Sequence, residues 1–241
     1  DLLCRARQPL DMIRKKKIQT YANISSDYVI SAPDASDLYA IPLNFEKENI
    51  GKKILQKLGL KRKKRPVWST WREYVRRIDK PRRTVHVGIV NKYVVTGAFK
   101  LADCFISVSQ ALVHAGAHLN IGVKIHWVDA ASVENADNPA DILGQYDGIL
   151  IPGGFGKQGV EGMILSCRYA RENKVPYLGL CYGMQIAVCE MARTMCGFEG
   201  AATTENCPDT PHPVITIIES QKETIAREGY GGTMRLGAYA A

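Results

Sequence analysis

The residues best suited to chemistry form the turn Gly179-Leu-Cys181-Tyr-Gly183. An apolar run over 176–180 precedes the turn and predicts a buried strand, and a helical pattern follows over 184–196. A glycine–nucleophile–glycine turn between strand and helix is typical of a nucleophile elbow. We therefore predict that Cys181 stands clear of the sheet at a helix N-terminus, where the helix dipole and backbone N–H groups favour a thiolate. The alternative is an inert cysteine buried in a glycine-rich turn.

A second glycine-rich segment, Pro152-Gly-Gly-Phe-Gly-Lys-Gln-Gly-Val-Glu-Gly162, follows a predicted strand over 146–151. Such a loop can turn its backbone N–H groups toward a phosphate or toward an oxyanion. A Walker phosphate loop needs serine or threonine after Gly-Lys, whereas Gln158 stands there. Two neighbouring strand ends, one with a nucleophile and one with N–H donors, indicate an acyl-transfer site. The N–H groups of Gly154 and Tyr182 are the natural oxyanion donors.

These two segments resemble the triad-type glutamine amidotransferase domain. Residues 201–205 (Ala-Ala-Thr-Thr-Glu) and 231–237 (Gly-Gly-Thr-Met-Arg-Leu-Gly) narrow the resemblance to the CTP synthase family. The resemblance covers almost the whole chain. It implies an α/β fold with a doubly wound, flavodoxin-like parallel sheet. The C-terminal part of a P-loop-type α/β synthetase domain would precede this sheet.

The resemblance also implies a function. In that family a carbon–nitrogen ligase of pyrimidine biosynthesis aminates UTP to CTP with ATP, using ammonia from glutamine hydrolysis. Cys181 would form a γ-glutamyl thioester. ATP and Mg²⁺ would bind mainly outside this segment, GTP would act as activator, and the enzyme would be a cytoplasmic homotetramer.

Site residues follow from the same resemblance. Glutamine would be held by the elbow and its surroundings, with Glu205 pairing with the α-ammonium: Gly154, Tyr182, Gly183, Met184, Gln185 and Glu205. In the synthetase part, Arg5 and Lys17 would lie near the UTP site. Pro33, Asp34 and Ala35 would lie near the ATP adenosine, although Lys17 also ends a basic run that solvent alone would explain. No metal ligand is predicted.

The general base is not evident. The family uses a His-x-Glu pair near the end of the domain, where the carboxylate orients the imidazole. None of the five histidines, at positions 86, 114, 118, 126 and 212, has an acid two residues later. We expect that the chain stops before the pair and before a glutamine-binding arginine, and that His212 is structural.

Three positions depart from the family pattern. Asn91 stands where glycine is usual, Gln158 where arginine is common, and Tyr182 where leucine is common. The last change alters the side chain beside the nucleophile but leaves its backbone donor. None of the three removes a chemical role.

Charge and composition suggest three parts. The net charge is +8, and residues 61–83 carry eleven lysines and arginines against two acids, so the remainder is close to neutral. We predict the end of the synthetase domain over 1–60, a basic linker over 61–83 and an amidotransferase domain, incomplete at its C-terminus, over 84–241. The confined basicity favours a solvated linker over a nucleic-acid surface. An apolar stripe of Trp68, Trp71 and Val75 would dock between the domains.

The expected elements differ between these parts. Strand-like runs are predicted over 17–24, 27–30 and 37–42, followed by an amphipathic helix over 46–60. From residue 84 strands (85–90, 123–128, 146–151, 176–180, 213–218) alternate with helices (107–115, 160–173, 184–196), with a loop over 131–140. That alternation predicts a parallel sheet with its site at the carboxyl ends of the strands.

Seven cysteines lie without Cys-x-x-Cys spacing, which argues against a zinc site or disulfide framework and for reduced thiols in the cytosol. No stretch reaches the length of a membrane span, and no leader is expected.

Two other functions stay open. One is an amidotransferase that feeds a different acceptor, against which residues 1–60 argue. The other is a non-catalytic binding or redox module with a cysteine elbow, whose residues 61–83 would contact nucleic acid.

Overall fold

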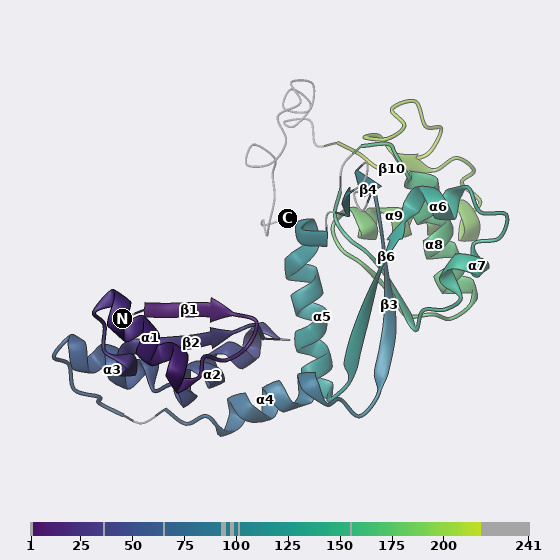
Figure 1. The fold of residues 1–241 in the computed structure, drawn as a ribbon. Helices are drawn as coiled ribbons and strands as arrows, with labels where there is room; N and C mark the ends of the chain where they lie inside the picture. Colours follow the sequence, from purple (N-terminus) through teal and green to yellow (C-terminus); the bar gives the residue numbers. More distant parts are fainter. Residues whose placement is uncertain are drawn as a thin grey trace. The chain divides into compact units, whose positions relative to one another are not determined.

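The computed structural model describes residues 2–35, 37–64, 66–92, 95–96, 99–100, 102–154 and 156–217 (Figure 1). The glycine-rich segment 231–237 lies outside these residues. The chain divides into two compact units, residues 1–83 with 115–122, and residues 84–114 with 123–241. No helix among the described residues is long and apolar enough to cross a membrane.

The first unit is built on two parallel strands, β1 (Leu2–Ala6) and β2 (Val29–Pro33). Its helices are α1 (Met12–Ala22), α2 (Ile41–Lys47), α3 (Ile50–Lys57) and α4 (Ser69–Asp79), with short 3₁₀ turns η1 (Ser26–Tyr28) and η2 (Leu38–Ala40). Val29 and Ile30 of β2 are buried. In the register of this pair Arg5 lies opposite Ala32. The carboxyl ends of β1 and β2 therefore lie side by side.

Three predictions for the first unit were wrong in type or extent. Most of the run over 17–24 belongs to helix α1, which ends at Ala22, because the Asp11 carboxylate caps the helix by accepting the Arg14 N–H at 2.8 Å. The run over 37–42 forms η2 and the start of α2. The expected helix over 46–60 is interrupted at Asn49, whose φ of 56° is left-handed and separates α2 from α3.

Aromatic side chains of α4 pack within the first unit. The Tyr39 ring meets the rings of Trp71 and Tyr74 edge-on, with centroids 6.1 Å and 5.6 Å away. The Trp71 indole N–H donates to the Tyr39 carbonyl at 2.9 Å. On the exposed side, hydrogen bonds from Arg76 and Arg77 hold the pKa of Glu73 at about 2. Part of the stripe expected to dock between domains is thus accounted for inside this unit.

The second unit begins with β3 (Thr84–Asn91), the pair β4 (Val95–Thr96) and β5 (Phe99–Lys100), and η3 (Ala102–Phe105). Next come α5 (Ile106–Leu119), whose last turn groups with the first unit, and β6 (Gly122–Asp129), α6 (Ala130–Glu134), α7 (Ala140–Leu143) and β7 (Gly148–Ile151). The remaining elements are α8 (Val160–Glu172), β8 (Tyr177–Gly179), α9 (Tyr182–Met195), β9 (Ala202–Thr203) and β10 (Pro213–Ile215).

Its main sheet has the order β6-β3-β7-β8, and β7 pairs in parallel with both β3 and β8. When only the four strands of this sheet are numbered in chain order, the order is 2-1-3-4, as at the start of flavodoxin-like sheets. The predicted parallel α/β sheet is confirmed. The loop expected over 131–140 was wrong in part: α6 lies there, because the Asp129 carboxylate caps it by accepting the Ala131 N–H.

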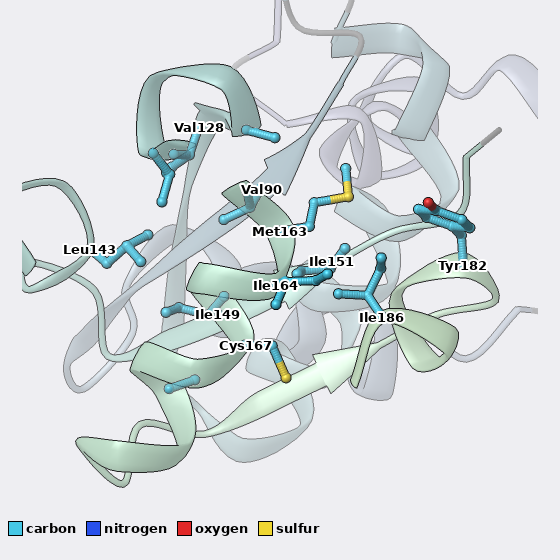
Figure 2. Packing of buried hydrophobic residues seen from close by; sticks show 13 residues of the cluster. Val90, Val128, Leu143, Ile149, Ile151, Met163, Ile164, Cys167, Tyr182 and Ile186 are labelled. Atoms are coloured by element: carbon cyan, nitrogen blue, oxygen red, sulfur yellow. The ribbon is translucent and has the colours of Figure 1, made fainter. Parts of the chain in front are cut away.

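The core of this unit joins the sheet to α8 and α9 (Figure 2). Ile149 and Ile151 of β7 pack with Met163 and Ile164 of α8 and with Ile186 of α9. Tyr182, the first residue of α9, belongs to the same cluster and is 1% exposed. The core therefore reaches to the residue next to Cys181.

An ion pair also joins α8 to α9. The Glu190 carboxylate, 1% exposed, accepts hydrogen bonds from Arg171 Nε at 3.1 Å and from Nη2 at 2.8 Å. A carboxylate so buried needs such a partner, because burial without one is costly. The pair therefore fixes how the helix that starts at the elbow lies on its neighbour.

We predict that Ile186→Ala lowers the free energy of unfolding by about 2–5 kcal/mol, because it leaves a cavity under the start of α9. The matched control is Met191→Ala on the same helix, whose side chain is 50% exposed; we expect it to stay within about 0.5 kcal/mol of the wild type. Urea denaturation followed by circular dichroism measures both. Equal losses would contradict the packing described for α9.

Candidate active site

The nucleophile elbow is present. Cys181 is exposed and lies between β8 and the first residue of α9, with φ 52° and ψ −105°. A residue held so far from the common backbone regions costs about 1–3 kcal/mol, and such strain is found at functional sites. The Cys181 carbonyl accepts the N–H groups of Met184 at 3.1 Å and Gln185 at 3.3 Å, which starts the helix.

Two glycines make this turn possible. A Cβ on Gly183 would lie 2.0 Å from the Ile151 carbonyl oxygen, and one on Gly179 would lie 2.5 Å from the Gly183 carbonyl carbon. The same Ile151 oxygen accepts the Leu180 N–H at 2.9 Å. The elbow therefore packs directly on the end of β7, and the spacing of glycines that predicted it has a steric cause.

The glycine-rich loop after β7 lies beside the nucleophile. A Cβ built on Gly153 would be 3.5 Å from Cys181 Cβ and 3.8 Å from Sγ, which is van der Waals contact. Gly154, the expected oxyanion donor, is the next residue. The structure thus brings together the two segments that sequence reasoning paired.

Glu205 joins the same region from the turn between β9 and β10. Its Oε1 accepts the Gly156 N–H at 3.1 Å, so the carboxylate is held against the glycine-rich loop. Of the six residues expected to hold glutamine, Gly183 is buried, Gln185 is half-buried and Met184 is half-exposed on the first turn of α9.

Lys92 was not predicted as a site residue. It follows β3 directly, and its ammonium lies 4.3 Å from the centroid of the Tyr182 ring. The same ammonium donates a hydrogen bond to the Gly156 carbonyl. On the other side the Asn206 amide donates to the Tyr182 hydroxyl. The sequence signal that could have identified Lys92 is its position directly after β3. That strand neighbours β7, and parallel strands end at the same edge of a sheet.

Burial controls the protonation of two groups here. Burial lowers the pKa of Lys92 to about 8, and the nearby Glu205 carboxylate opposes that shift. Burial likewise raises the pKa of the Tyr177 phenol, which therefore stays protonated. The Tyr177 hydroxyl donates to the Gly183 carbonyl at 2.7 Å, which ties β8 to the first turn of α9.

No histidine among the described residues makes a hydrogen bond with the Cys181 thiol. His86 and His126 bond to each other, with 2.9 Å between Nδ1 and Nε2, and their rings stack. The His212 ring stacks on Phe198 with centroids 5.1 Å apart, which fits the structural role expected for it. The described part of the chain therefore supplies a nucleophile and donors, and no partner that would act as base.

In the first unit a cavity of about 320 Å³ collects four of the five residues expected near nucleotides, namely Arg5, Pro33, Asp34 and Ala35. Arg5 Nε and the Asp34 carboxylate lie 3.2 Å apart at its rim. Lys17, the fifth residue, is exposed on α1 and does not line this cavity. The described residues contain no group of three His, Cys, Asp or Glu side chains placed to hold a metal ion.

A parallel α/β sheet with a cysteine elbow and a facing glycine-rich loop defines an acyl-transfer fold of the amidotransferase type. The model of the class-I glutamine amidotransferases matches residues 100–240, and the chain belongs to that family. The model described as CTP synthase N-terminus matches residues 1–60. The recognition made from the elbow and the glycine-rich loop is confirmed.

Known proteins extend this match over the whole chain. The CTP synthase of Methanocaldococcus jannaschii is 43% identical over 246 residues, which cover 100% of this chain and 44% of that protein. The CTP synthase of Methanopyrus kandleri is 43% identical over 98% of this chain and 43% of its own length. The chain thus spans less than half the length of these relatives.

A solved structure supports the fold of the second unit. The glutaminase domain of Trypanosoma brucei CTPS with bound acivicin matches with a TM-score of 0.51 and 31% identity. That match covers 58% of this chain and 53% of the other.

The lowered pKa of Lys92 gives a prediction. We expect its ammonium to titrate near pH 8 in the folded protein, compared with about 10.4 for an ordinary lysine. Because the folded pKa is the lower one, the group opposes folding fully below pH 8 and progressively less as the pH rises to about 10.4. NMR of ¹³C-labelled lysine measures the midpoint, and Lys92→Arg assigns the signal. A midpoint above pH 10 would contradict the burial of this ammonium.

Proposed function

We propose that the protein containing this chain is a CTP synthase, and that the second unit releases the ammonia it uses by hydrolysing glutamine. The observation that carries the proposal is the position of Cys181. It is an exposed thiol at the start of a helix, beside the glycine-rich loop that Glu205 anchors. The matches of residues 1–60 and of the whole chain to CTP synthases support the choice of acceptor.

In the proposed reaction the Cys181 sulfur attacks the carboxamide carbon of glutamine. The carbonyl oxygen becomes an oxyanion, which the N–H groups of Gly154 and Tyr182 stabilise. Collapse breaks the carbon–nitrogen bond, releases ammonia and leaves a γ-glutamyl thioester, which water hydrolyses to glutamate. A general base must take the thiol proton and return a proton to the nitrogen. No described residue is assigned to that role.

Glu205 would bind the α-ammonium of glutamine. Its Oε1 is already held by the Gly156 N–H, and its second oxygen offers further lone pairs. Gly183, Met184 and Gln185 would contact the substrate through the first turn of α9. In the solved relative, acivicin is bound to the glutaminase domain. We propose that this chain binds glutamine-like compounds at the corresponding elbow.

For the first unit we propose a share of the nucleotide site. The cavity beside Pro33 and Asp34 would receive part of ATP. Arg5, which also lines it, and Lys17, which lies outside it, would lie toward UTP. ATP activates the pyrimidine oxygen that ammonia replaces. We assign no Mg²⁺ ligand to the described residues.

GTP activation, the homotetramer and the cytoplasmic location are proposed from the same family membership. The domain limits 1–60, 61–83 and 84–241 also stay a proposal.

The central test compares nitrogen sources in the full-length gene product with UTP, ATP and Mg²⁺. We expect Cys181→Ser to lower CTP formation from glutamine at least about 10³-fold, because the nucleophile is lost. CTP formation from free ammonia should stay close to that of the wild type.

Cys196→Ser at the far end of α9 is the matched control, since that thiol is also exposed. Equal loss with both nitrogen sources would show that Cys181 does not act in glutamine hydrolysis. If the wild-type protein makes no CTP from either source but hydrolyses glutamine, another acceptor is indicated.

A second test concerns the first unit. We expect Asp34→Ala to raise the KM for ATP about tenfold, because it removes a wall of the cavity and the partner of Arg5. Lys17→Ala is the comparison and should leave the KM for ATP unchanged while raising that for UTP. Steady-state kinetics with ammonia as nitrogen source separates the two. An unchanged KM for ATP in Asp34→Ala would remove this cavity from the nucleotide site.

A further inference from the structure

Lys92 touches both segments that carry the proposed oxyanion donors. Its hydrogen bond to the Gly156 carbonyl reaches the glycine-rich loop two residues after Gly154. Its contact with the ring of Tyr182 reaches the elbow at the residue whose backbone N–H is the other donor. A single side chain from the end of β3 thus spans the two donor segments, which come from the ends of β7 and β8.

The Tyr182 ring is held on more than one side. Tyr182 is 1% exposed, Lys92 lies over the face of its ring, and the Asn206 amide donates to its hydroxyl. A cation over an aromatic face is attracted by the ring, and more strongly when the pair is desolvated. Tyr182 also stands where leucine is common in the family, and leucine offers neither contact. The direction of the Tyr182 backbone N–H is therefore coupled to Lys92 through its own side chain.

We propose that Lys92 is a positioning residue for glutamine hydrolysis, which fixes the distance between the oxyanion donors of Gly154 and Tyr182. This inference rests on the proposed function of the second unit. Lys92 takes part in no covalent step and does not touch the carboxamide carbon of glutamine. With a pKa of about 8 it carries its charge at neutral pH, as both contacts require.

The geometry separates this role from substrate binding. The ammonium is engaged by the Gly156 carbonyl and the Tyr182 ring, and Glu205 is the carboxylate that raises its pKa. A residue that binds glutamine equally in the ground and transition states would change KM alone. A residue that fixes the donors acts where the oxyanion develops and changes kcat.

The test measures glutamine hydrolysis by the full-length protein with Lys92→Met, which keeps the chain length and removes the charge. We expect kcat to fall about 10- to 100-fold, while KM stays within about threefold. Lys92→Arg should restore most of kcat, since a guanidinium can make both contacts. Lys157→Met, an exposed lysine in the same loop, is the matched control and should behave as the wild type.

Coupling is tested with Tyr182→Leu, alone and combined with Lys92→Met. If the two residues act together, the double variant loses about as much kcat as the more damaged single variant. Alkylation of Cys181 by iodoacetamide and the melting temperature show whether each variant keeps the fold. Tyr182→Leu supplies the answer should Lys92→Met not fold.

Several outcomes would overturn the inference. A rise in KM with unchanged kcat would make Lys92 a substrate-binding residue. Fully additive losses would show that it does not act through Tyr182, and wild-type kinetics in Lys92→Met would show that it does not act at all. If the wild-type protein itself does not hydrolyse glutamine, the proposed function fails instead, and the two failures are distinguishable.

Discussion

The close approach of Gly183 to the carbonyl of Ile151 is the constraint on which the second unit depends. The position of a missing Cβ, 2.0 Å from that oxygen, shows that no other residue fits without moving the backbone. The same oxygen binds the Leu180 N–H. One carbonyl at the end of β7 therefore sets both where the elbow turns and how near it lies to the loop that continues from β7. The strain at Cys181 is sustained by this packing.

Local turn chemistry explains why the elbow could be predicted from the sequence. Gly179 is required by its contact with Gly183 four residues later, so the spacing of the two glycines carries the information, although the contact that requires Gly183 itself is with Ile151 on the neighbouring strand. The same holds for the alternation from β3 to α9, where long apolar segments match the sheet and its helices. The parallel sheet follows from that alternation, and the identity of the family follows from the motifs at the strand ends.

The wrong and the missing predictions have physical causes of two kinds. The segments 17–24 and 131–140 were misread because single capping side chains, Asp11 and Asp129, decide the helices there. The expected helix over 46–60 was divided by one left-handed residue, Asn49. Lys92 was missed for a different reason. Its partners lie 64 and 90 positions further along the chain, and only the strand order brings them together.

The Arg171–Glu190 pair bears on how the second unit loses activity on heating. Cys181 sits at the tip of α9, and that helix is pinned to α8 by a buried charge and to the sheet by Ile186. Because α9 is fixed at these two places, we expect its first residue to keep its position for as long as the helix stays packed. The nucleophile and the core are therefore lost together. Thermal inactivation of this half of the molecule would follow the melting of its interior, with no preceding stage in which the fold survives and the thiol has drifted.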